Sequence, residues 1–187
     1  MGTLSYIKNF LKDKDVAAIT PSSRFLVRRV CDWIDFSEDC IVVEYGPGTG
    51  VFSEYILEHM SADSTLLLIE SNEEFVDQLN QMAARDSRVI VVEDRAENIA
   101  DIMEAHALSE ADYVVSGIPF SFLDADVKRQ LIVRTREVLA DDGKFLVYQN
   151  YNHMEEPLRR HFPTVNKEYE IRNIPPTYAY EARKADS

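Results

Sequence analysis

The chain has 187 residues, near the upper range for one domain, and its 45% hydrophobic and 28% charged residues are the composition of a globular protein. Its net charge of −13 opposes the phosphate backbone of nucleic acid, so composition argues against a duplex-binding protein. No apolar run approaches the length of a membrane span, and the first residues lack the apolar core of a secretory signal. The two cysteines make neither a disulfide framework nor a zinc site. We therefore expect a cytoplasmic protein.

The N-terminal segment differs in charge from the rest. Residues 1–31 hold six basic side chains against two acidic ones. Residues 3–12 show an amphipathic helical pattern, and Ser22 or Ser23 is a candidate N-cap for a second helix that runs through Ile34. We expect a helical extension over residues 1–35, followed by one domain over 36–187. The basic side of this extension suits an anionic surface, and a solvated helix explains it equally well.

Apolar runs then alternate with helical patterns along the chain. Runs rich in Val, Ile and Leu predict buried strands, and the periodic stretches between them predict amphipathic helices. This alternation predicts a parallel sheet with helices on both faces. The expected strands are residues 41–45, 65–70, 88–93, 111–117 and 143–150, and the expected helices are 51–60, 72–85, 96–107 and 124–140. The tail differs, because "KEYEIRN" and "TYAYEAR" are joined only through "IPP" and so predict two antiparallel strands.

A glycine-rich loop, "EYGPGTG" (44–50), follows the first of these strands. Its spacing is G-x-G-x-G, which is neither the dinucleotide fingerprint nor a P-loop, so neither phosphate-cradling pattern fits. Glu70 ends the next strand and is placed to accept the hydroxyls of a ribose, and Asp94 follows the third strand. Acids at strand ends are common caps and surface residues, yet their succession at neighbouring strand ends indicates a nucleoside site.

This set of residues resembles the class I S-adenosylmethionine-dependent methyltransferases over residues 40 to about 150. The resemblance implies an α/β, Rossmann-like seven-stranded sheet in the order 3-2-1-4-5-7-6 with one antiparallel strand and helices on both faces. It implies that S-adenosyl-L-methionine is the cofactor, with its methionine part on the "EYGPGTG" loop, its ribose on Glu70 and its adenine beside Asp94 and Arg95. The candidate cofactor-binding residues are Glu44, Gly46, Pro47, Gly48, Gly50, Glu70, Ser71, Asp94, Arg95 and Ser116.

The fourth strand ends in "SGIPFSFL" (116–123), which looks like the acceptor motif of amino-group methyltransferases. In such a motif a carbonyl accepts the N–H bonds of the amine and so aims its lone pair, and an aromatic ring walls the approach. The candidate catalytic residues are Gly117, Pro119, Phe120 and Tyr148. The alternative is a plain turn built on Gly117 and Pro119, with Tyr148 an ordinary strand residue. Ribosomal RNA adenine dimethylases share this motif but have Asn where this chain has Gly117.

Further segments resemble the bacterial phospholipid N-methyltransferases: "ITPSSRFLVRR", "VVSGIPFSFL" and "RNIPPTYAYEAR". This resemblance implies methyl transfer to the amine of phosphatidylethanolamine, with peripheral membrane contact through residues 3–14. Methylation of an RNA adenine or a small amine, or a silent cofactor-binding module, stay as alternatives. Tyr148, Tyr151 and His153 are candidates to deprotonate the amine. Arg159, Arg160 and Lys167 suit a lipid phosphate, or equally a solvated helix face.

Overall fold

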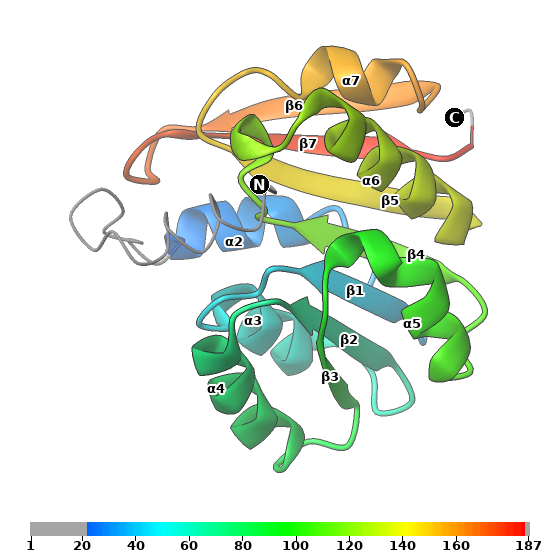
Figure 1. Ribbon diagram of the computed structural model, residues 1–187. Coiled ribbons are helices and arrows are strands. Elements are labelled where there is room, and N and C mark those ends of the chain that lie inside the picture. The colour runs from blue at the N-terminus through cyan, green and yellow to red at the C-terminus, as the bar shows by residue number, and fades with distance from the viewer. Residues whose placement is uncertain (1–21, 186–187) are drawn as a thin grey trace.

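The computed structural model describes residues 22–185 and builds them around a seven-stranded sheet in the order β3-β2-β1-β4-β5-β7-β6 (Figure 1). Strands β1 to β5 pair in parallel, and β7 runs antiparallel to both of its neighbours, β5 and β6. This confirms the expected order with one antiparallel strand. The strands are β1 Ile41–Tyr45, β2 Thr65–Glu70, β3 Val89–Glu93, β4 Ala111–Ser116, β5 Leu139–Gln149, β6 Thr164–Glu170 and β7 Thr177–Arg183.

Helices form in all four stretches where the amphipathic patterns after residue 35 predict them, and two further short elements, Phe120–Phe122 and Glu155–Arg159, were not predicted. The pattern over 96–107 divides into a 3-10 turn and an α-helix, and β5 begins at Leu139 rather than 143 because Leu139 already pairs with Ala111. Ser23 caps its helix by accepting a hydrogen bond from the Leu26 amide. The helical elements are α2 Arg24–Cys31, α3 Val51–His59, α4 Glu73–Ala83, η1 Ala96–Asn98, α5 Ile99–Ala105, η2 Phe120–Phe122, α6 Ala125–Val138 and α7 Glu155–Arg159.

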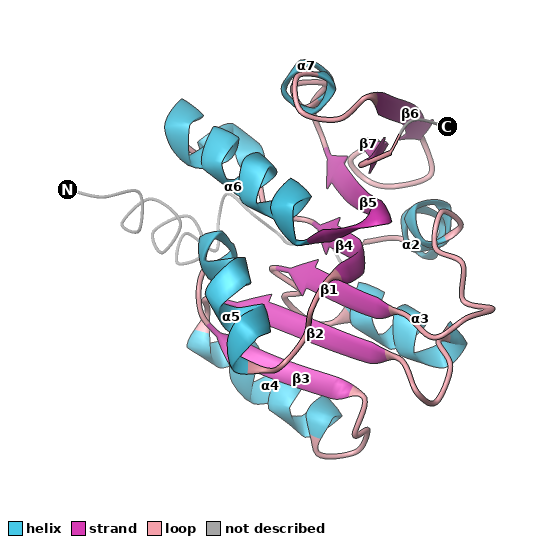
Figure 2. Ribbon diagram, turned by 90° about the vertical axis from the view of Figure 1, so that its right-hand side faces the viewer, coloured by secondary structure: helices cyan, strands magenta, loops and turns pink. Residues whose placement is uncertain are grey.

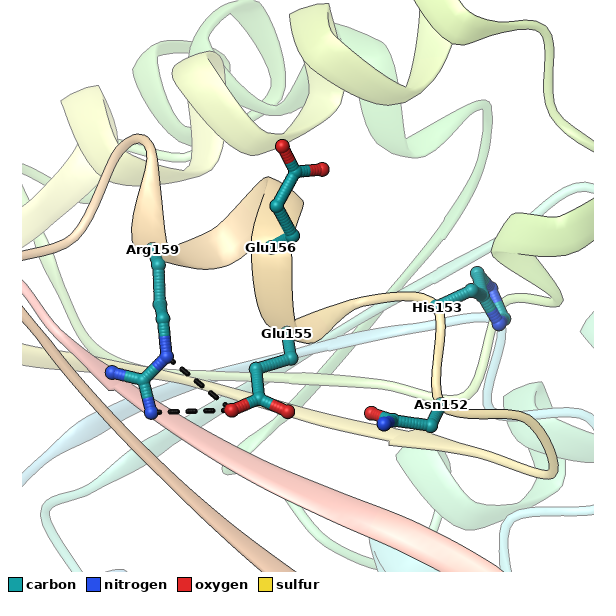
Figure 3. A pocket seen from close by; sticks show the side chains of 5 residues that line it. All are labelled: Asn152, His153, Glu155, Glu156 and Arg159. Carbon is teal, nitrogen blue, oxygen red and sulfur yellow. Dashed lines mark hydrogen bonds and ion pairs between the residues drawn. The ribbon is translucent and has the colours of Figure 1, made fainter.

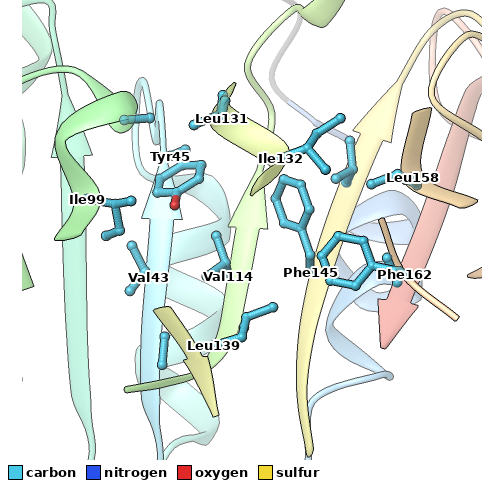
Figure 4. Packing of buried hydrophobic residues seen from close by; sticks show 14 of the residues in the cluster. Val43, Tyr45, Ile99, Val114, Leu131, Ile132, Leu139, Phe145, Leu158 and Phe162 are labelled. Atoms are coloured by element: carbon cyan, nitrogen blue, oxygen red, sulfur yellow. The ribbon is translucent and has the colours of Figure 1, made fainter. Parts of the chain in front are cut away.

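Two apolar clusters cover the two faces of the sheet. In Figure 2, α5 and α6 lie on one side of the sheet, and α2 and α3 lie on the other. The larger cluster packs α5, α6 and α7 onto strand residues such as Val114 and Phe145, as Figure 4 shows. The smaller cluster packs α2 and α3 onto the opposite face, around Val42 and Leu146. Strands that are buried on both faces explain why they read as continuous apolar runs.

Helix α2 is part of this packing, because its apolar residues lie in the smaller cluster with β5 and β7. The amphipathic helix expected over residues 3–12, and the membrane contact expected over 3–14, lie outside the described residues. Within residues 22–185, none of the helices has both the length and the apolar character that crossing a membrane demands. Cys31 and Cys40 are buried with free thiols.

The strand register brings the carboxyl ends of the strands to one edge of the sheet. Tyr45 at the end of β1 lies between Ile69 and Ser116 of the neighbouring strands, and Glu70 lies beside Glu93. The loops that follow β1, β2, β3, β4 and β5 therefore meet at this edge, where open α/β sheets hold their ligands.

Candidate active site

The loop after β1 is shaped by three glycines in the left-handed region. Gly46, Gly48 and Gly50 have φ angles of 63°, 57° and 81°, which other residues adopt only with strain. The Gly46 amide donates to the Ile69 carbonyl at 2.9 Å, and the Gly50 amide donates to the Pro47 carbonyl at 3.0 Å. A Cβ on Gly48 would meet no atom within 4 Å, so this glycine borders open space. The loop thus presents bare backbone at the sheet edge.

Glu70 joins this loop to the end of β2. Its side chain is buried, and it accepts hydrogen bonds from the amides of Gly48 at 3.1 Å, Ser71 at 2.8 Å and Asn72 at 2.9 Å. A carboxylate has about four acceptor positions, so about one stays open for a ligand hydroxyl. The structure therefore brings three of the predicted cofactor-binding residues together: Gly48, Glu70 and Ser71.

Glu44 is the second carboxyl group beside the loop. It is 1% exposed, and its Oε2 accepts a hydrogen bond from the Ser53 hydroxyl at 2.6 Å. Burial, with a smaller contribution from the negative charge of Glu70, raises the pKa of Glu44 to about 7. A cation bound beside Glu44 would favour its ionised form.

Asp94 and Arg95 lie on the far side of Glu70 from the glycine loop. The Asp94 amide donates to the Glu70 carbonyl at 3.1 Å, which fixes the two strand ends together. The Asp94 carboxylate accepts from the Arg95 amide at 2.7 Å and from Asn98 Nδ2 at 2.8 Å. The Arg95 guanidinium pairs with Glu97 at 2.6 Å. Asp94 therefore organises the first turn after β3, next to the expected nucleoside position.

The loop after β4 carries the expected acceptor motif, and it meets Tyr148 of β5. Ser116, at the end of β4, is fully buried. A Cβ on Gly117 would lie 2.1 Å from the Tyr148 hydroxyl, so the phenol occupies the space above this glycine. The Tyr148 ring stacks on Phe52 of α3 with centroids 4.5 Å apart and planes 12° apart. Burial raises the pKa of Tyr148, and a hydrogen bond with Ser22 opposes that shift.

Gly117 thus has no room for a side chain, because the phenol of Tyr148 from the adjacent strand occupies that space. Tyr148 therefore supplies the polar group at this position. The neighbouring Phe120 turns inward instead. Its ring is fully buried and meets Phe145 edge-on with centroids 6.4 Å apart, so the aromatic wall expected from Phe120 is absent in the structure. Phe120 belongs to the core because it follows Pro119 into the turn η2 beneath the loop.

Gln149 is a residue that sequence analysis did not select. Its Oε1 accepts from the Phe120 amide at 3.1 Å, and its Nε2 donates to the carbonyls of Ile118 at 2.7 Å and Tyr148 at 2.6 Å. Gln149 therefore clamps the loop after β4 to the end of β5 and occupies the Ile118 carbonyl. A single Gln at a strand end has no distinguishing local pattern, and only the pairing of β4 with β5 gives it this role.

The segment between β5 and α7 holds the remaining candidates (Figure 3). Tyr151 is 71% exposed, and His153 lines a hollow of ≈ 520 Å³ with Asn152, Glu155, Glu156 and Arg159. His153 Nε2 is buried without a hydrogen-bond partner, and burial, followed by the charge of Lys128, lowers the pKa of His153. The three cations that were considered for a lipid phosphate form ion pairs in the structure: Arg159 and Lys167 with Glu155, and Arg160 with Glu156.

These features fit a nucleoside that carries a cation. Bare backbone beside open space at Gly48 admits a close ligand, and Glu70 retains acceptor capacity for hydroxyls. A positive charge nearby would stabilise the ionised form of Glu44, which burial disfavours. S-adenosyl-L-methionine combines these properties.

Comparison with known proteins adds two relatives by sequence. The chain is 30% identical over 183 residues to the ornithine lipid N-methyltransferase of Singulisphaera acidiphila, which covers 94% of this chain and 92% of that protein. A shorter match, 30% identical over 83 residues, covers 44% of the chain and 24% of ribosomal RNA small subunit methyltransferase H of a Psychrobacter species. No protein-family model matches the chain.

Solved structures share the fold. The 1,6-didemethyltoxoflavin-N1-methyltransferase of Burkholderia thailandensis, solved with S-adenosylhomocysteine, has a TM-score of 0.72 at 16% identity over 98% of this chain and 87% of that one. The N-methyltransferase NodS of Bradyrhizobium japonicum, also solved with S-adenosylhomocysteine, has a TM-score of 0.70 at 14% identity over 100% of both chains. At these identities the likeness concerns the fold.

Proposed function

We propose that this protein methylates the amine of a membrane lipid. The proposal starts from the family of the chain: it belongs to the family of the ornithine lipid N-methyltransferase, within the class I S-adenosylmethionine-dependent methyltransferases. It is therefore an S-adenosylmethionine-dependent N-methyltransferase. The bound cofactor supplies an electrophilic methyl group on a sulfonium centre. The chain's own residues bind the cofactor, orient the amine and exclude water from the site.

On the cofactor side, the glycine loop and two carboxyl groups share the binding. The backbone of Gly46 to Gly50 leaves room for the amino acid part, and Glu70 accepts hydroxyl hydrogen bonds. Glu44, at the end of β1, adds negative charge where a cation is bound. Asp94 and Arg95 border the base through the turn that Asp94 organises.

On the acceptor side, one observation carries the proposal: the Tyr148 hydroxyl fills the space above Gly117 at the end of β4. The oxygen of this phenol can accept a hydrogen bond from the N–H of an amine and so aim the lone pair of the amine. His153 stays the candidate to receive the proton that the alkylammonium must lose, although burial lowers its pKa and so makes it a weaker base. Positioning, rather than acid–base chemistry, supplies most of the rate.

The acceptor chemistry that we propose is a primary alkylamine on a lipid headgroup. Ornithine lipid and phosphatidylethanolamine both present such an amine. The match to an ornithine lipid N-methyltransferase along nearly the whole chain favours the ornithine headgroup. The shorter match to a ribosomal RNA methyltransferase, on a chain of net charge −13, favours RNA less.

The test offers methyl-labelled cofactor with ornithine lipid vesicles, phosphatidylethanolamine vesicles and bulk RNA in separate reactions. We expect label in a lipid amine, and label in RNA alone would overturn the proposal. Tyr148→Phe keeps the ring stacking on Phe52 and removes the hydroxyl, so we expect transfer to fall about 10-fold with cofactor affinity unchanged. Glu70→Gln tests the cofactor side of the site in the same way. Calorimetry should show that it weakens cofactor binding by roughly 1–3 kcal/mol.

A further inference from the structure

Exposed apolar side chains gather at the edge of the sheet that holds the site. Within residues 22–185, the exposed large hydrophobic side chains are Phe122 (45%), Tyr151 (71%), Tyr169 (46%), Ile171 (70%) and Ile174 (76%). All except Tyr169 lie in turns that follow the carboxyl ends of strands: Phe122 after β4, Tyr151 after β5, and both isoleucines after β6. Single exposed apolar residues are common, but a group around one site mouth indicates an interaction surface.

The sheet topology explains why the turn between β6 and β7 belongs to this edge. Because β7 is antiparallel to both β5 and β6, the end of β6 points the same way as the ends of β4 and β5. Gln149, the last residue of β5, lies opposite Tyr178, whereas Glu170 and Thr177 pair one position further out. The turn of residues 171–176 therefore projects past β5. In Figure 1 this turn lies on the left, on the same side as the start of α2.

This turn is held firmly although its isoleucines face water. The buried Glu170 carboxylate accepts hydrogen bonds from Arg29 Nε at 2.8 Å and from the Arg172 guanidinium at 2.7 Å. Asn173 Nδ2 donates to Thr177 Oγ1 and to the Pro175 carbonyl, each at 2.9 Å. The exposure of Ile171 and Ile174 is thus built into a braced turn, so little order is lost when the turn binds a surface.

Two arginine side chains, those of Arg24 and Arg172, flank the same turn. The Arg172 guanidinium lies 4.3 Å from the Phe25 ring centroid, and that of Arg24 lies 5.0 Å from it on α2. The Ser23 amide donates to Asn173 Oδ1 at 2.8 Å, so the N-cap of α2 lies against the turn. Isoleucines bordered by cations match a bilayer, whose acyl layer lies under a layer of phosphates.

We propose that the 171–176 turn, with Phe122 and Tyr151, is a docking surface for a lipid bilayer, which inserts Ile171 and Ile174 and sets the loop after β4 at the level of the headgroups. The choice of a bilayer as the occupant rests on the proposed lipid substrate. Insertion at this edge would let a headgroup reach the site while its acyl chains stay in the membrane.

The first test uses the single tryptophan of the chain, Trp33, as a tool. In Trp33→Phe/Ile174→Trp, the full-length protein is mixed with phosphatidylcholine vesicles that contain anionic lipid and brominated acyl chains, without cofactor. We expect a blue shift and quenching of the fluorescence of the introduced indole. Trp33→Phe/Asp142→Trp, with the indole at the exposed start of β5 on the opposite edge, should show neither. Equal quenching at both positions, or none at position 174, would overturn the proposal.

The second test separates this surface from the proposed function. Ile171→Ser/Ile174→Ser should lower vesicle binding in sedimentation roughly 10- to 100-fold, with an unchanged thermal unfolding midpoint and unchanged transfer to a short-chain, water-soluble amine lipid. Unchanged vesicle binding would remove the docking surface and leave the lipid methyltransferase standing. Intact vesicle binding with methyl transfer to RNA alone would remove the substrate and leave the surface.

Discussion

At the scale of single residues, the site combines groups that are individually unfavourable without a ligand. Glu44 is a buried carboxyl group with one hydrogen-bond donor, Ser53, and another carboxylate nearby. Burial of such a group destabilises its ionised form, and the raised pKa of about 7 expresses this. Glu44 therefore links cofactor binding to protonation near neutral pH.

We predict that Glu44→Gln removes a pH dependence of stability. The pKa of Glu44 rises from its ordinary value of 4.5 to about 7 on folding, so its contribution to the free energy of unfolding is fully present below pH 4.5 and is lost as the pH rises through 7. Gln keeps an acceptor for Ser53. Urea unfolding of the cofactor-free protein at pH 5 and pH 8 should show the wild type losing about 1–3 kcal/mol more than the variant.

Glu54→Gln, which changes an exposed carboxylate on the same helix as Ser53, is the control and should behave as the wild type. In the wild type, cofactor affinity should rise between pH 5 and 8 because a bound cation favours the ionised Glu44. Parallel pH profiles for all three proteins would show that Glu44 does not titrate in this range.

At the scale of elements, the junction of β4 and β5 sets the acceptor side. Gln149 at the end of β5 holds the loop after β4 through the Ile118 carbonyl and the Phe120 amide. The preceding residue, Tyr148, projects to the opposite face of the sheet and covers Gly117, since neighbouring strand residues alternate in direction. Two consecutive residues of one strand thus fix and complete the loop of another.

We predict that Gln149→Leu loosens this junction. The substitution keeps similar volume but leaves the Phe120 amide and Ile118 carbonyl without partners, which costs about 1–3 kcal/mol of unfolding free energy. Hydrogen exchange at the Phe120 amide should accelerate, and methyl transfer should fall while cofactor affinity holds. Gln130→Leu, at an exposed position on α6, provides the comparison and should change neither quantity. A slow Phe120 amide in Gln149→Leu would contradict the clamp.

At the scale of the whole molecule, α2 and the β6–β7 pair close the side of the sheet next to the site. Glu170, with a side chain only 1% exposed, joins Arg29 of α2 to Arg172 of the turn. These hydrogen bonds, first from Arg172 and then from Arg29, hold the pKa of Glu170 far below its ordinary value. The contribution of Glu170 to stability is therefore present above pH 4.5 and declines as the pH falls below that value.

We predict that Glu170→Gln destabilises the protein by about 2–4 kcal/mol at pH 7, because it leaves two guanidinium groups without their shared carboxylate. The loss should shrink in acid, where the wild type also loses this charge. Glu168→Gln removes the more exposed partner of Arg29, with a side chain 43% exposed, and should cost less than about 1 kcal/mol in the same urea titration. Equal losses in the two variants would show that Glu170 is not the residue that joins α2 to the turn.

Local patterns in the chain determined the parts of this protein that depend on nearby residues. The apolar runs at 41–45 and 65–70 are strands with those bounds, Ser23 caps α2, and the three glycines adopt the left-handed angles that their loop needs. The strand order followed from the resemblance of the glycine loop and strand-end acids to a family. These features are readable because burial period, capping and backbone freedom act over a few residues.

The tertiary structure alone decided which distant residues complete the site. Tyr148 covers Gly117, Gln149 holds the acceptor loop, and Phe120 enters the core instead of walling the approach of the amine. Glu170 braces a turn that carries isoleucines to the site edge, although its segment reads as an ordinary charged strand. Such pairs are set by the register between strands that are far apart in the chain, and no local pattern records that register.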